Sequence, residues 1–189
     1  MMKLNFKQME DSELISLLFT TKHKDAAFAE IYERYSRRVY AYCKKMLHYN
    51  VEEANDVFQD VFIRFYNSIN KNHYYGNLQN FLLTIARNLC LNQIRDKKNH
   101  VPLDEAIMVE GRSEYDSYEL KELLNKASNM LEIEYKEVFI LRMYDGLEYE
   151  EIAEIIGEKA ATVRSRVWRA KERIKVILQK YFDEYEFNK

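Results

Sequence analysis

A cluster of cationic and polar side chains occupies the stretch from residue 159 to residue 180. It holds eight lysines and arginines against one glutamate. At helical spacing, such side chains form a basic surface that can bind the phosphates and base edges of DNA. The residues assigned to this surface are Arg164, Ser165, Arg166, Trp168, Arg169, Lys171 and Lys175.

A short helix, a tight turn and a longer helix are needed to hold this surface in place. Residues 149–156 predict the short helix, with Ile152, Ala153 and Ile156 facing inward. Gly157 can adopt the positive φ angle of a tight turn. A stripe at spacings of four and three then follows, made of Val163, Val167, Ala170, Ile174 and Ile177. The pattern predicts a helix-turn-helix with its second helix in the major groove; a solvated basic face on an ordinary helix is the alternative.

A second candidate surface combines carboxylates, an amide and one large aliphatic side chain. Asp56, Gln59, Asp60 and Ile63 share one helix face by their spacing. The inward positions of the same helix are apolar: Val57, Val61, Phe62 and Phe65. A mixed face of this kind suits a protein partner, and an ordinary amphipathic helix is the alternative.

A third candidate surface begins in the polar, asparagine-rich segment 70–77. Tyr74 and Tyr75 are adjacent there and could stack on unpaired bases. The alternative is that both rings fold back over the helices. With polar and basic groups from the next helix, the candidate set is Tyr74, Tyr75, Asn77, Asn80, Arg87, Asn88 and Arg95.

The composition favours helices and excludes several classes of protein. Four glycines and one proline in 189 residues are few for a fold rich in strands and turns, and the 15 tyrosines and 10 phenylalanines are expected mainly in helical cores. Cys43 and Cys90 belong to no Cys/His cluster, so no metal site is expected. Scattered histidines and the lack of a glycine-rich phosphate loop predict no enzyme activity, cofactor or small-molecule substrate.

The same features indicate a soluble protein of the cytoplasm. Two lone cysteines fit a reducing compartment, and the first residues lack a signal-peptide apolar run. No run of about 18 apolar residues occurs, so no direct membrane insertion is expected. The net charge of −2 argues against indiscriminate nucleic-acid binding, so local charge must decide where phosphate docks.

Periodicity predicts an all-α chain of two small helical domains joined by a linker. The first domain, residues 10–98, contains a short and a long helix over 14–46 with a break at 20–25, then helices over about 52–69 and 78–97. The acidic stretch 99–117 is the linker. The second domain, residues 118–182, contains a helix beginning near 118, another over 135–143, and the helix-turn-helix.

Taken together, these segments resemble an RNA polymerase sigma factor of the extracytoplasmic-function (ECF) group of the sigma-70 family. Residues 56–66 resemble the family's polymerase-binding helix, residues 80–98 its −10 promoter helix, and residues 135–174 its −35 domain. The order and spacing of the three segments also fit. Phe81 and Asn92 stand where the family usually has Trp and Asp. The run 158–161 lacks the serine that usually caps the second helix.

The resemblance implies a non-enzymatic bacterial factor that directs core RNA polymerase to promoters and assists DNA melting. Its partners would be core polymerase through Asp56, Gln59, Asp60 and Ile63, promoter DNA through the other two sets, and an anti-sigma factor. A dimeric helix-turn-helix regulator that binds an operator is the main alternative, and a helical adaptor for other proteins is a third. The dimeric regulator predicts a symmetric protected DNA site in the absence of polymerase.

Overall fold

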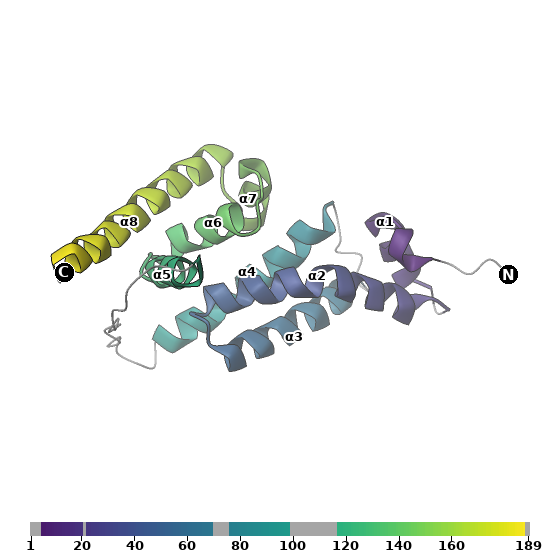
Figure 1. Ribbon diagram of the computed structural model, residues 1–189. Helices are drawn as coiled ribbons and strands as arrows, with labels where there is room; N and C mark the ends of the chain where they lie inside the picture. Colours follow the sequence, from purple (N-terminus) through teal and green to yellow (C-terminus); the bar gives the residue numbers. More distant parts are fainter. Residues whose placement is uncertain (1–4, 21, 70–75, 99–116, 188–189) are drawn as a thin grey trace. The chain divides into compact units, whose positions relative to one another are not determined.

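A computed structural model describes residues 5–20, 22–69, 76–98 and 117–187 (Figure 1). Within these ranges the chain forms helices only, which confirms the all-α prediction. They are η1 (Phe6–Gln8, 3₁₀), α1 (Asp11–Leu18), α2 (Lys24–Met46), α3 (Val51–Ile69), α4 (Leu78–Lys98), α5 (Ser117–Asn129), α6 (Ile133–Met143), α7 (Tyr149–Ile156) and α8 (Ala160–Phe187). The predicted linker, apart from Ser117, lies outside the described residues.

The chain divides into two compact units, residues 1–92 and 93–189. This division falls inside α4, whereas periodicity places the end of the first domain at the end of that helix, at residue 98. None of the helices within the described ranges is long and apolar enough to cross a membrane.

The first unit is held together by aromatic rings between α2 and α3, which lie side by side (Figure 1). The ring centroids of Tyr32 and Phe62 are 4.8 Å apart, and those of Phe28 and Phe65 are 6.3 Å apart. Phe65 also meets the edge of Phe81 on α4 at 6.3 Å. Such pairs contribute about 0.5–1.5 kcal/mol each beyond the area they bury, so the rings fix how α3 packs on α2 and how α4 packs on α3.

Arg34 on α2 ties the N-terminal helices to this bundle. Its guanidinium pairs with Glu30 at 2.8 Å and Asp11 at 3.1 Å, and donates to the Phe6 carbonyl at 2.9 Å. The hydrogen bond to Glu30 is the main cause that raises the pKa of Arg34. One side chain therefore joins η1, α1 and α2.

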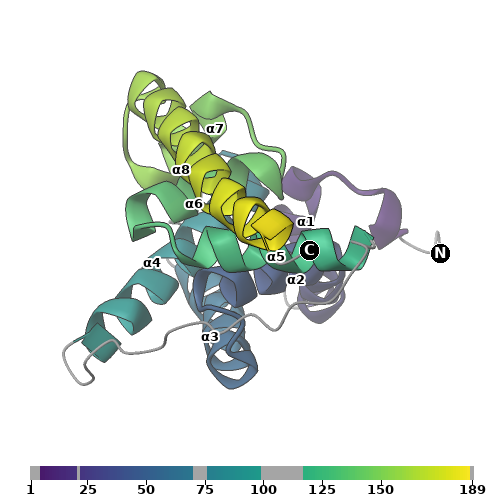
Figure 2. The same cartoon turned by 60° about the vertical axis from the view of Figure 1, so that its left-hand side comes forward.

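The second unit packs α5 and α6 against α8 (Figure 2). Its core includes Ala127 from α5, Tyr135 and Phe139 from α6, and Ala170 and Ile174 from α8. Small residues at 127 and 170 let the helix backbones approach closely. α8 is thus an integral part of this core.

Arg34→Met should loosen the N-terminal helices, because Asp11 and the Phe6 carbonyl lose a charged donor. We expect a local loss of about 1–2 kcal/mol, moderated by the partial exposure of the pair. Amide hydrogen exchange over residues 11–18 would measure it. Arg37→Met, at an exposed arginine of the same helix, is the control, and equal acceleration in both variants would contradict the role of Arg34.

Candidate nucleic-acid interface

The helix-turn-helix predicted around Gly157 is present. α7 begins with a capping box in which the Glu148 amide donates to the Glu151 carboxylate at 2.8 Å. It ends at Gly157 with φ 72° and ψ 35°, a left-handed conformation that glycine adopts without steric cost. The amides of Gly157 and Glu158 both donate to the Ala153 carbonyl, at 2.9 and 3.0 Å. The turn therefore satisfies the end of α7 and leads directly into α8.

The aliphatic stripe predicted for the second helix is its buried side. Val163, Val167, Ala170 and Ile174 are at most 5% exposed, and Ile177 is half-buried. Burying an aliphatic side chain of valine or isoleucine size stabilises a fold by about 1.5–3 kcal/mol. The stripe therefore fixes the rotation of α8 about its own axis.

Most of the predicted DNA-binding side chains lie on the opposite side of α8. Exposed there are Arg164, Ser165, Trp168, Arg169, Lys171 and Lys175. Trp168 is 64% exposed, which is unusual for so large an apolar ring in a folded domain. The helix thus presents cations, a hydroxyl and an indole to solvent on one surface.

Tyr149, at the start of α7, is flanked by two arginines. The guanidinium carbons of Arg142 and Arg164 lie 4.8 and 5.0 Å from its ring centroid. Arg142 also donates to the Leu147 carbonyl at 2.7 Å and pairs with Glu148 at 3.0 Å. The hydrogen bond to Glu148 is the main cause that raises the pKa of Arg142. These contacts join α6 to the start of α7 and place Arg164 beside both.

Two arginines on the α6 side of α8 contact their own domain instead. The Arg166 guanidinium pairs with Glu158 at 3.1 Å and lies 3.9 Å from Glu134. Arg173 pairs with Glu132, and its guanidinium lies 4.1 Å from the Tyr135 ring centroid. Helical spacing alone did not reveal these pairings, because the carboxylates come from the turn and from the start of α6.

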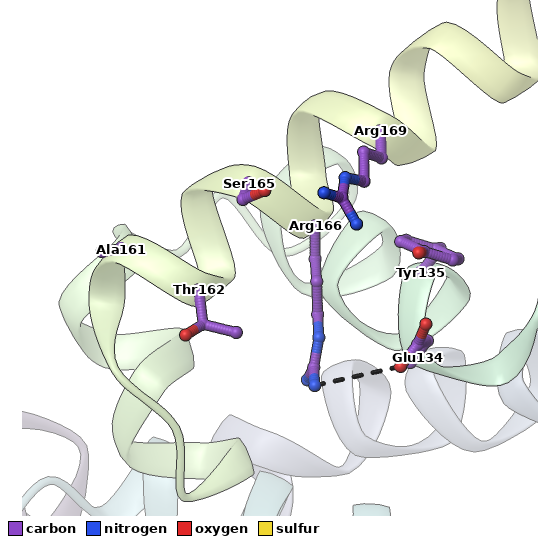
Figure 3. A pocket seen from close by; sticks show the side chains of 7 residues that line it. All are labelled: Glu134, Tyr135, Ala161, Thr162, Ser165, Arg166 and Arg169. Carbon is purple, nitrogen blue, oxygen red and sulfur yellow. Dashed lines mark ion pairs between the residues drawn. The ribbon is translucent and has the colours of Figure 1, made fainter.

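A hollow of about 530 Å³ separates these α8 residues from the start of α6. Figure 3 shows Arg166 reaching across it toward Glu134, with Arg169 and Tyr135 nearby. The remaining lining residues are Ala161, Thr162 and Ser165. Carboxylate and guanidinium groups therefore share this part of the surface. Within the described part of the chain, no group of histidine, cysteine or acidic side chains could hold a metal ion.

The face predicted on α3 is exposed in the structure. Asp56, Gln59 and Asp60 are exposed, and Ile63 is 58% exposed. The predicted inward residues Val57, Val61, Phe62 and Phe65 are all buried. α3 therefore has one side in the aromatic core and one acidic, partly apolar side in solvent.

The third predicted set is divided between surface and interior. Tyr74 and Tyr75 lie outside the described residues. The Asn77 side chain caps α4 by accepting from the Asn80 amide at 3.1 Å, and Asn80 is only 7% exposed. Asn88 and Arg95 are exposed further along α4, with Arg87 half-buried. Burial of Asn80 follows from its place in the first turn of a helix that packs on the bundle.

Two family models match separate parts of the chain. Residues 31–100 match Sigma-70 region 2, and residues 121–174 match Sigma-70 region 4. The ECF RNA polymerase sigma factor SigW of Bacillus subtilis (strain 168) is 32% identical over 164 residues, covering 79% of this chain and 87% of SigW. The ECF sigma-E factor of Haemophilus influenzae (strain ATCC 51907 / DSM 11121 / KW20 / Rd) is 29% identical, covering 92% and 97% of the two chains.

Solved structures share the fold. CnrH, solved with the cytosolic domain of CnrY, superposes with a TM-score of 0.67 at 17% identity, over 90% of this chain and 97% of that chain. The sigma factor RpoE from Bartonella quintana, solved with the anti-sigma factor NepR, gives 0.65 at 24% identity, over 80% and 96%.

Two helical units, one of them a helix-turn-helix with a basic outer face, define a promoter-recognition factor of the sigma-70 kind. The chain belongs to the ECF family of RNA polymerase sigma factors. It directs core RNA polymerase to promoters, as the resemblance implied.

Substitution of Gly157 should destabilise the C-terminal unit through the backbone alone, since a Cβ atom there would meet nothing within 4 Å. We expect Gly157→Ala to cost about 1 kcal/mol and Gly157→Asn less, because asparagine tolerates the left-handed region better. Urea unfolding of the two variants would measure both costs. An asparagine variant as unstable as the alanine variant would contradict this explanation.

Proposed function

We propose that three surfaces divide the work of this sigma factor. The exposed face of α3 binds core polymerase, the exposed face of α4 with segment 74–77 binds the −10 element, and the outer face of α8 binds the −35 element. The chain itself performs no catalysis. The observation that carries the proposal is α8, which is anchored by a buried stripe while it exposes cations, a hydroxyl and Trp168 on the other side.

At the −35 element, the first turns of α8 read bases and the turns that follow bind phosphates. Arg164, Ser165 and Trp168 are exposed near the start of the helix, where a recognition helix contacts base edges. Arg169, Lys171 and Lys175 follow and provide charge for the DNA backbone. Arg166 differs from these residues, because its guanidinium is engaged by carboxylates of its own unit.

At the −10 element, Arg87, Asn88 and Arg95 contact the strand, and segment 74–77 captures an unstacked base. Extruding a base costs a few kcal/mol, which stacking and edge hydrogen bonds must offset. Asn80 supports the start of α4 from inside rather than contacting DNA, because its side chain is buried.

On α3, Asp56, Gln59 and Asp60 form the polar part of the polymerase contact, and Ile63 supplies an apolar anchor. An exposed isoleucine among carboxylates and an amide fits the centre of a protein interface with a polar rim. The protein acts in the cytoplasm, where core polymerase is found. An anti-sigma factor is a further partner, as NepR is for RpoE of Bartonella quintana.

Transcription in vitro with purified core polymerase and a randomised promoter library tests the proposal. We expect initiation from a defined subset of sequences only when the chain is added. Stable binding to core polymerase without initiation at any sequence would contradict it. A symmetric protected site on DNA without polymerase would favour an operator-binding regulator instead.

Charge reversal on α3 should weaken the polymerase contact selectively. Asp56→Lys and Asp60→Lys are each expected to reduce affinity for core polymerase roughly tenfold or more, because a like charge then faces the partner. Competition binding with labelled core polymerase would measure it. Glu33→Lys, at an exposed carboxylate of α2, is the control. An equal loss in the control would argue against a specific face on α3.

Removing late cations of α8 should weaken promoter binding by holoenzyme about equally at every sequence. Lys171→Ala and Lys175→Ala should each reduce the slope of log affinity against log salt by about one, since each removes a phosphate contact. Lys7→Ala, at an exposed lysine of η1, is the control. A change in sequence preference with an unchanged salt slope would show that these lysines do not bind phosphate.

A further inference from the structure

The start of α8 lacks a side chain that could cap it. α8 begins at Ala160, and the Lys159 carbonyl accepts the first hydrogen bond, from the Val163 amide at 3.1 Å. Lys159 therefore stands at the capping position, where serine, threonine, asparagine or aspartate is normally found. A lysine ammonium has no acceptor for the amides of the first turn.

A carboxylate one residue earlier makes a different contact. Glu158 directly follows Gly157, and its Oε1 accepts from Arg166 Nη2 at 3.1 Å, eight residues along the chain. The bond spans the turn and the first two turns of α8. The negative charge of Glu158 also lies near the N-terminus of α8, where the helix dipole makes a negative charge favourable.

The same guanidinium nitrogen lies 3.9 Å from Glu134, in the first turn of α6. Arg166 thus joins the turn, α8 and α6, and its side chain is only 21% exposed. Arg169, one turn further along α8, is exposed and makes no ion pair within the described part of the chain.

We propose that Arg166 is a positioning residue of the DNA-reading helix, and that its bond to Glu158 fixes the start of α8 in place of a capping side chain. The inference rests on the proposed −35 role of α8. Neutralised by two carboxylates, Arg166 does not serve as a base or phosphate contact. The specificity of the helix then depends on Glu158, although that residue need not touch DNA.

A positioning role and a direct DNA contact of Arg166 predict opposite effects of Glu158→Gln on DNA binding. If Arg166 bound DNA, Glu158→Gln would free it, remove a negative charge and strengthen binding. If the pair positions α8, Glu158→Gln must weaken binding, and Arg166→Gln must weaken it by a similar factor. In that case the double variant is no worse than either single variant, because both lose the same bond.

Promoter affinity of holoenzyme decides between these predictions, with DNA selected from a random library as the probe. We expect about a fivefold loss for Glu158→Gln, for Arg166→Gln and for the double variant, the upper end for a partly exposed ion pair. The salt slope should stay unchanged. Glu150→Gln, at an exposed carboxylate of α7 that pairs with no cation among the described residues, is the matched control and should not weaken binding. Stronger binding by Glu158→Gln, or a salt slope lower by about one for Arg166→Gln, would overturn the proposal.

Amide hydrogen exchange on the isolated chain provides a second test, which needs neither promoter nor polymerase. Glu158→Gln should accelerate exchange at residues 163–166, the first hydrogen-bonded amides of α8, about fivefold. Glu150→Gln should leave those amides unchanged. Unchanged exchange in Glu158→Gln would refute the positioning role. Failure of the wild-type chain to support initiation would instead refute the proposed function.

Discussion

The C-terminal unit depends on the rotation of α8 about its own axis, because this helix serves the interior and the surface at once. Its stripe of Val163, Val167, Ala170 and Ile174 is buried against the other helices, while cations and Trp168 are exposed. Successive residues in an α-helix are about 100° apart, so a shift of one position would bury cations and expose valines. The left-handed Gly157 turn sets where the helix begins, and the stripe sets how it is rotated. α8 can make specific contacts with DNA only because its start and its rotation are both fixed.

α3 meets the same constraint with different chemistry. One side contributes Phe62 and Phe65 to the aromatic contacts with α2, and the other exposes Asp56, Asp60 and Ile63. Aromatic packing is insensitive to salt, so Asp56 and Asp60 are not needed to hold α3 and are available to a partner. α8, by contrast, carries two arginines, Arg166 and Arg173, which pair with carboxylates of the turn and of the start of α6. Contacts of that kind are weakened by ionic strength, which makes the buried stripe the main anchor of the helix.

Periodicity predicted the helices well because each helix buries one continuous apolar stripe, whose residues recur at helical spacing in the local sequence. The inward faces of α3 and α8, and the turn at Gly157, follow from spacing and from the freedom of glycine. The direction of individual polar side chains does not. Asn80 is buried because the first turn of α4 packs on the bundle, and Arg166 turns inward because Glu158 and Glu134 are brought within reach. Such partners come from other elements, so the spacing of residues within a single helix does not reveal them. The eight-residue separation of Glu158 and Arg166 was the one available hint.

Charge distribution explains why a DNA-binding chain can carry a net charge of −2. Of the cations between residues 159 and 180, Arg166 and Arg173 are paired with carboxylates of their own unit, which leaves a limited set for phosphate. Because affinity for duplex DNA rises with the number of phosphates neutralised, one such helix binds weakly at physiological salt. A second DNA contact raises the affinity only if the two DNA-binding surfaces are held at the right separation. Each surface then has a raised effective concentration at its own site. We expect core polymerase to provide that alignment. We therefore expect weak binding by the free chain to make promoter recognition conditional on assembly with polymerase, and we expect the carboxylates that neutralise part of α8 to contribute to that condition.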